Sequence, residues 1–124
     1  MRILKSSRSL PIYLDGFFSV CEFVDDPQSD YPMPILKVRK VGISFSELQI
    51  FDTTKSAYKS AGVEVVRKIR TRPIRLDSKL FVKIGEDIYK VENAVTAFNS
   101  SGFEETDITL SKFTESFQME VDGS

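Results

Sequence analysis

Residues 68–112 read KIRTRPIRLDSKLFVKIGEDIYKVENAVTAFNSSGFEETDITLSK, and this stretch decides the predicted fold. A basic run leads into residues 80–84, a tight turn at Gly85-Glu86-Asp87 and residues 88–95, and a polar loop then leads to a last strand at 107–111. Apolar side chains alternate along these segments with the period of two that is typical of a half-buried strand. The stretch therefore predicts two successive units that resemble β-hairpins.

The beginning of the chain predicts a further hairpin. Residues 10–14 place Leu10, Ile12 and Leu14 on one side, and the turn dipeptide Asp15-Gly16 separates them from residues 17–24. Such a dipeptide between alternating segments is typical of a hairpin turn. Because Pro11 cannot donate a ladder hydrogen bond, the first strand should lie at an edge or begin there.

The middle of the chain combines loop, strand and helix signals. Residues 25–34 contain three of the five prolines and predict a loop. Residues 35–45 return to a strand pattern, in which Gly42 marks a bulge or a close backbone approach.

Residues 46–62 are the least strand-like part. There Asp52 is expected to cap a short, weak helix over residues 53–61, with Gly62 directly after its end.

Together these segments predict a mainly β fold, a small antiparallel β-barrel or sandwich with one short helix or long loop inserted. We expect a single barrel domain over residues 1–113 and an acidic tail over residues 114–124 that is mobile unless a partner holds it. The expected core consists of apolar positions on successive strands: Ile69, Leu80, Val82, Ile84, Tyr89, Val91, Ile108 and Leu110.

Composition limits the possible functions. The chain has no histidine and one cysteine, so triads with a histidine base and most transition-metal sites are excluded, and we expect no enzyme, no cofactor and no metal. Cys21 lies in a strand-like segment and is expected to be a buried hydrophobe in a reducing cytoplasm. No segment has the ~20 apolar residues of a membrane span, nor the pattern of a signal peptide, so we expect a soluble, non-secreted protein with no membrane partner.

Charge is balanced overall but uneven along the chain. The formal net charge of −1 argues against a protein whose main task is to wrap nucleic acid. A basic strand at residues 63–75 holds Arg67, Lys68, Arg70, Arg72 and Arg75. The acidic residues concentrated after position 101 include Glu104, Glu105 and Asp107.

These two regions are either solvated faces of opposite sign or complementary surfaces between copies of the chain or with other rings. The basic strand is also the one candidate for contact with DNA phosphates. It has no interleaved aromatic residues, so such contact would be transient and non-specific.

The order of basic strand, small hairpin with G-x-x-x-Y at residues 85–89, glycine-containing loop and short terminal strand resembles the head-closure, or stopper, branch of siphophage head–tail connectors. The resemblance is weak over residues 10–45 and stronger over residues 63–112. It implies a structural virion protein of the phage neck, assembled in the host cytoplasm, that helps to retain packaged DNA and offers a platform for the tail.

The partners implied by the resemblance are other proteins of the particle. They are a homo-oligomeric ring, dodecamer or hexamer, the portal or adaptor proteins, the tail terminator or tail tube proteins and, transiently, double-stranded viral DNA. In that family a long segment between two strands projects toward the central channel. Residues 46–62 hold the matching position, which makes Asp52, Lys55 and Lys59 candidates for facing the channel, and the loop at residues 25–34 is the other candidate segment.

Three alternatives remain open. The protein could be a tail terminator or another neck ring, which would be separated from a head-closure ring by whether it purifies with tails or with filled heads. A small barrel that binds nucleic acid would show an affinity that falls steeply with salt. A small enzyme is the third, and the absence of histidine counts against it.

Overall fold

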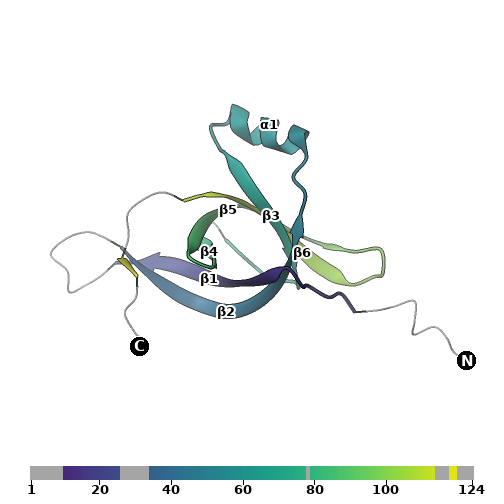
Figure 1. Ribbon diagram of the computed structural model, residues 1–124, viewed down its shortest axis with the longest axis horizontal. Helices are drawn as coiled ribbons and strands as arrows, with labels where there is room; N and C mark the ends of the chain where they lie inside the picture. The colour runs from purple at the N-terminus through teal and green to yellow at the C-terminus, as the bar shows by residue number, and fades with distance from the viewer. Residues whose placement is uncertain (1–9, 26–33, 78, 114–117, 120–124) are drawn as a thin grey trace, which may run out of the picture.

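A computed structural model describes residues 10–25, 34–77, 79–113 and 118–119 of the chain (Figure 1). The elements, in chain order, are β1 (Gly16–Val24), β2 (Ile35–Leu48), α1 (Asp52–Ser60), β3 (Val65–Thr71), β4 (Leu80–Ile84), β5 (Asp87–Phe98), β6 (Glu104–Lys112) and β7 (Gln118–Met119). Six strands close into an antiparallel barrel in the order β1-β4-β5-β6-β3-β2, because β2 pairs back with β1. The predicted small barrel with an inserted helix is confirmed.

The long strand β2 closes the barrel. From Ile35 to Phe45 it pairs with β1, and from Ser46 to Leu48 it pairs with β3. Its register with β1 shifts between Phe18 and Val20, where β2 contains an extra residue beside Gly42. Gly42 has φ +67, a conformation that glycine adopts without steric cost, so the predicted bulge is confirmed. Such a bulge bends the strand, which helps β2 to pair with both β1 and β3.

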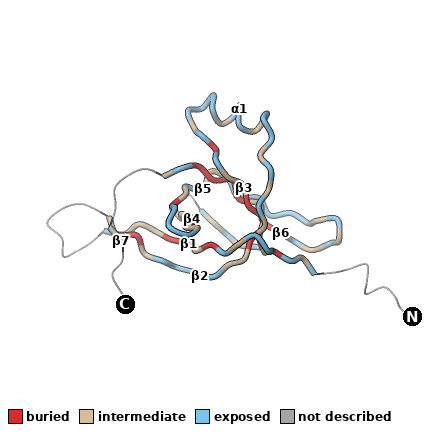
Figure 2. Tube along the Cα trace, in the orientation of Figure 1, coloured by how far each residue is buried: buried red, intermediate tan, exposed pale blue. Residues whose placement is uncertain are grey.

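Side chains from all six strands fill the barrel interior. The buried residues are coloured red along the trace in Figure 2. Four of the predicted core residues are fully buried: Ile69, Val82, Ile108 and Leu110. The other four are partly buried and pack against them: Leu80, Ile84, Tyr89 and Val91. The predicted core is therefore confirmed, and β1 and β2 add the buried Phe18, Val20 and Phe45.

A second apolar cluster lies on the outer face of the barrel wall. It contains Cys21, Leu36 and Ile88, with Phe23, Phe81 and Phe113 packed against them. Neighbours such as Val20 and Val82 point into the barrel, and successive strand residues point to opposite faces. The rings of the three phenylalanines lie 4.7 to 5.1 Å apart, as expected for favourable aromatic pairs.

The buried state predicted for Cys21 is confirmed, and burial raises the pKa of its thiol.

The C-terminal region reaches back to the start of β2. The amide of Phe113 donates to the carbonyl of Ile88 at 3.4 Å, and β7 pairs in parallel with Ile35 and Leu36. Two residues of the tail are thus part of the sheet. The expected mobility of the rest of the tail concerns residues 114–117 and 120–124, which lie outside the described residues.

The predicted hairpin at the beginning of the chain is wrong. Residues 10–14 form no strand, and Leu10, Ile12 and Leu14 are 72%, 71% and 83% exposed, whereas Tyr13 is buried. The reason is that β1 pairs with β2 on one side and, from Ser19 to Glu22, with β4 on the other, so most of the edge that residues 10–14 would need is occupied. The true partner of β1 in a hairpin is β2.

Replacement of Leu110 by alanine tests the assignment of the core. Leu110 is fully buried, so Leu110→Ala should lower the free energy of unfolding by about 2–5 kcal/mol. Urea denaturation of both proteins is the measurement. Val41→Ala is the control, since Val41 is exposed on β2 and its loss should change stability by less than about 0.5 kcal/mol. Equal effects of the two substitutions would contradict the assignment.

Candidate functional site

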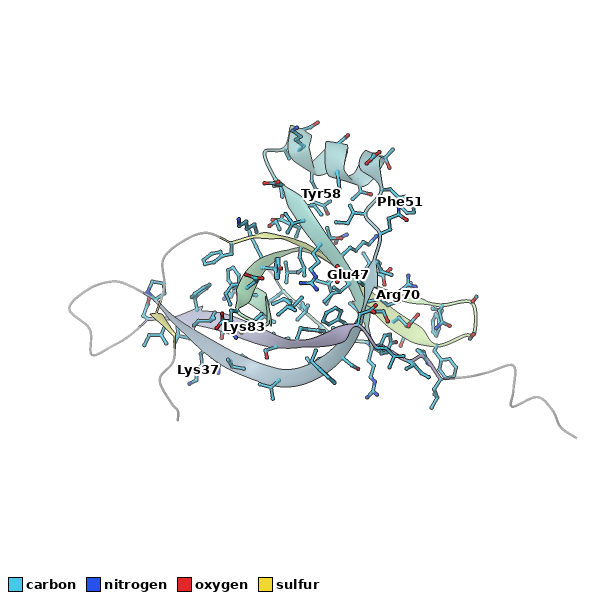
Figure 3. The ribbon with its side chains drawn as sticks, viewed as in Figure 1. Lys37, Glu47, Phe51, Tyr58, Arg70 and Lys83 are labelled. Carbon is cyan, nitrogen blue, oxygen red and sulfur yellow. The ribbon has the colours of Figure 1, made fainter. Side chains whose placement is uncertain are left out.

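Helix α1 stands outside the barrel wall, between the end of β2 and the start of β3 (Figure 1). None of its residues is buried, although Tyr58 is half-buried on the side that faces the barrel (Figure 3). The weak helical propensity of its threonine and serine residues agrees with this position, because a helix without a buried face gains little from packing. The helix is therefore an addition to the barrel and contributes little to its core.

The ends of α1 differ in part from prediction. The residue that precedes the helix is Phe51, no side chain caps the first turn, and Asp52 is the first helical residue. The capping role predicted for Asp52 is therefore wrong, although its negative charge still suits the helix N-terminus. Gly62 follows the helix end with φ +82 and donates its amide to the carbonyl of Lys59 at 2.9 Å, as predicted.

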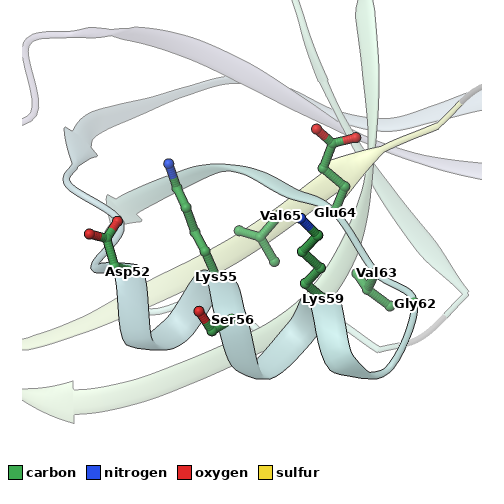
Figure 4. Close-up of a pocket in the computed structure, with 8 residues that line it drawn as sticks. All are labelled: Asp52, Lys55, Ser56, Lys59, Gly62, Val63, Glu64 and Val65. Atoms are coloured by element: carbon green, nitrogen blue, oxygen red, sulfur yellow. The ribbon is translucent and has the colours of Figure 1, made fainter.

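An open hollow of about 720 Å³ lies between α1 and the start of β3 (Figure 4). Its charged lining consists of Asp52, Lys55, Lys59 and Glu64. Lys55 and Lys59 rise from the same face of the helix, as their spacing predicts. Within the described part of the chain neither lysine has a salt-bridge partner. The hollow thus holds two ammonium groups and two carboxylates, and its charged lining is balanced.

Arg67, one of the residues assigned to the basic strand, pairs with a carboxylate of the same chain. Its Nε donates to both carboxylate oxygens of Glu47, at 2.9 and 3.1 Å. The guanidinium lies 5.5 Å from the centre of the Phe45 ring and 5.7 Å from that of Tyr89, distances at which cation–π attraction acts. Burial alone would lower the pKa of Arg67, but the hydrogen bonds to Tyr89 and Glu47 raise it.

Arg67 therefore links β3 to Glu47, which lies near the end of β2 that leads to α1 (Figure 3).

Arg70 is also paired within the chain. It lies opposite Asp107 on the neighbouring strand β6, and the two side chains form a bidentate pair at 2.7 and 3.0 Å. The hydrogen bond to Asp107 raises the pKa of Arg70. The basic strand and part of the acidic region thus neutralise each other inside one copy. Lys68, Arg72, Arg75 and Glu104 form no salt bridge with a described residue, and they are the charges left for other partners.

Glu105 holds the N-terminal arm, defined here as residues 10–15, against the barrel. The hydroxyl of Tyr13 donates to Glu105 at 2.6 Å, and the side-chain amide of Asn99 donates to the other carboxylate oxygen at 3.0 Å. Burial raises the pKa of Tyr13, and the hydrogen bond to Glu105 raises it further. Sequence reasoning missed Tyr13, because the two partners are 92 residues apart and no local pattern connects them.

The described residues contain neither a candidate metal site nor a membrane-spanning helix. In residues 10–25, 34–77, 79–113 and 118–119 no group of three histidine, cysteine or acidic side chains could hold a metal ion. No helix in the same ranges has the length and apolar composition needed to cross a membrane. No protein-family model matches the sequence, and no curated protein matches it.

Removal of the Tyr13 hydroxyl tests the arm contact. Tyr13→Phe deprives the buried Glu105 carboxylate of a donor and should lower the free energy of unfolding by about 1–3 kcal/mol. Urea denaturation at neutral pH gives the value. Tyr58→Phe serves as the control, since the hydroxyl of Tyr58 has no hydrogen bond among the described residues and its loss should have little effect.

The difference in unfolding free energy between the natural protein and Tyr13→Phe should depend on pH. Because the folded state raises the pKa of Tyr13 above its ordinary value of 10.0, the stabilisation is present below pH 10 and is lost as the pH rises beyond it. The difference between the natural protein and Tyr13→Phe should therefore narrow above pH 10. A difference that is absent at neutral pH would show that the hydroxyl does not hold the arm.

Proposed function

We propose that this chain is a structural, non-enzymatic protein of the neck of a tailed phage virion, assembled in the host cytoplasm. In this proposal it forms a head-closure ring below the portal and adaptor, helps to retain packaged DNA and offers the tail a docking platform. The observation that carries the proposal is a closed barrel from which α1 projects between β2 and β3 with no buried residue. This position is the one that the sequence resemblance assigns to a channel segment.

The barrel supports this role because its stability does not depend on the projecting segment. The core is built by β1 to β6, so residues between β2 and β3 can serve a neighbour or a channel without weakening the fold. Lys55 and Lys59 would then be the cations nearest to DNA, and their positive charge favours phosphate groups. The net charge of −1 suits a ring through which DNA has to pass without being held tightly.

The structure narrows the segment that would act at the channel. Ser46, Glu47 and Leu48 belong to β2 and pair with β3, so removal of all of residues 46–62 would damage the barrel. The projecting part is residues 49–62. The other candidate loop, residues 25–34, is described only at Asp25 and Pro34, and its eight middle positions, 26–33, lie outside the described residues.

A nucleic-acid-binding module is the weaker alternative. Two of the five basic side chains assigned to phosphate contact, Arg67 and Arg70, are bound to Glu47 and Asp107. A protein that neutralises many phosphates needs a continuous row of available cations. The proposal of a neck ring requires no such row.

Replacement of residues 50–62 by a short glycine-serine linker tests the proposal. The free energy of unfolding of the purified variant should change by less than about 1 kcal/mol, because α1 buries no residue in the core. In a phage that encodes this chain, the same replacement should give filled heads that lose DNA or fail to join tails. Particles that keep their DNA and infect normally would refute the channel role, and co-purification of the chain with free tails would favour a tail terminator.

A second variant tests whether the two lysines of the projecting segment matter, without removing the segment itself. Lys55→Ala with Lys59→Ala should leave the fold unchanged and increase the loss of DNA from heads. The matched control is Lys40→Ala with Lys79→Ala, which removes two exposed lysines that do not line the hollow beside α1. DNA release measured by nuclease sensitivity should rise only for the first pair. Equal release from both pairs would mean that these two lysines have no special place at the channel.

A further inference from the structure

The outer half of β5 has an open edge. On one side β5 pairs with β6 as far as Phe98, but on its other side the pairing with β4 ends at Lys90. No strand within the described ranges pairs with residues 93–98 on that side. The β5–β6 hairpin extends beyond the barrel at this point (Figure 1). The backbone groups of this edge are therefore available to another strand.

The sequence of this edge lacks the features that usually prevent strand addition. Residues 93–98 read NAVTAF and contain no charge and no proline, whereas natural edge strands are commonly protected by both. Val95 is 50% exposed and Phe98 is 71% exposed. An uncharged, exposed edge is the type of surface to which an extended segment adds as a new strand.

The N-terminal arm has the complementary properties. Its residues belong to no strand, and the exposed Leu10, Ile12 and Leu14 alternate with the partly buried Pro11 and the buried Tyr13. The arm is fixed at its base, because the Tyr13 hydroxyl bonds Glu105 and the Asp15 amide donates to the carbonyl of Phe45 at 3.0 Å.

We propose that residues 10–14 of one copy add as a strand to residues 93–98 of β5 in a second copy. The exposed apolar residues of the arm would lie beside Val95 and Ala97, which share one face of β5 because side chains alternate along a strand. A neighbouring copy is favoured over the same copy because Tyr13 is fixed to β6, and the open edge lies on the far side of β5 from β6.

A contact between two different surfaces of the same chain repeats from copy to copy and builds a ring or a filament. The inference goes beyond the virion role, since it requires only that copies of the chain meet.

Disulfide trapping between mixed copies tests the contact. Ile12→Cys is made in a copy with a mass tag, and Ala97→Cys in a copy without it; the native Cys21 is fully buried in both. After mixing at high protein concentration and mild oxidation, the tagged–untagged dimer should form several-fold more than in the control mixture of Ile12→Cys with Val41→Cys. Val41 is equally exposed but lies on β2.

A second substitution shows whether the open edge itself is the binding surface. Val95→Lys, added to the Ala97→Cys copy, should reduce the trapped dimer several-fold, because an edge lysine opposes strand addition. Val41→Lys in the same copy should leave the yield unchanged. A yield equal to that of the control mixture, a predominance of Ala97–Ala97 dimers, or an unchanged yield with Val95→Lys would each overturn the proposal. Because disulfide trapping uses only purified protein, its outcome does not depend on whether the chain acts in a phage neck.

Discussion

The hydrogen bonds between β1 and β2 are the constraint on which the rest of the structure depends, because they turn an open sheet into a closed barrel. Closure places the side chains of Phe18, Phe45 and Leu110 in one interior and removes most of the unpaired strand edges. It also requires β2 to bend, and the bulge beside Gly42 provides that bend. Where the ring of strands is incomplete, along the outer half of β5, an edge remains open to another chain.

Closure also decides which charges remain available. Arg67 joins β3 to β2 through Glu47, and Arg70 joins β3 to β6 through Asp107, so both act as structural residues. Lys55 and Lys59 on the projecting helix, and Arg72 and Arg75 after β3, are among the exposed cations without a salt bridge to a described residue. Since the core is complete without α1, this helix can be exposed at little energetic cost to the fold. A protein built in this way is suited to present a segment to partners, which is what a neck ring needs.

Local sequence signals predicted the parts of the fold that local chemistry determines. The β4–β5 hairpin follows from Gly85, whose φ of +63 suits a tight turn, and the buried Cys21 follows from its place in an apolar strand. The turn dipeptide Asp15-Gly16 predicted a hairpin that does not form. The cause lies in the tertiary structure, because β1 pairs with β2 on one side and with β4 on the other. The pairs that fix the charged residues join positions 37 and 92 residues apart, and composition alone does not reveal such partners. The placement of Lys55 and Lys59 on one helix face was predictable, because helical periodicity alone determines it.

Electron microscopy of the intact particle of a phage that encodes this chain tests the central claim most directly. The account predicts a ring of closed barrels between the portal and the tail, with the helix between β2 and β3 directed toward the axis of the channel. Density for the barrel elsewhere in the particle, or a ring in which this helix points away from the axis, would contradict it.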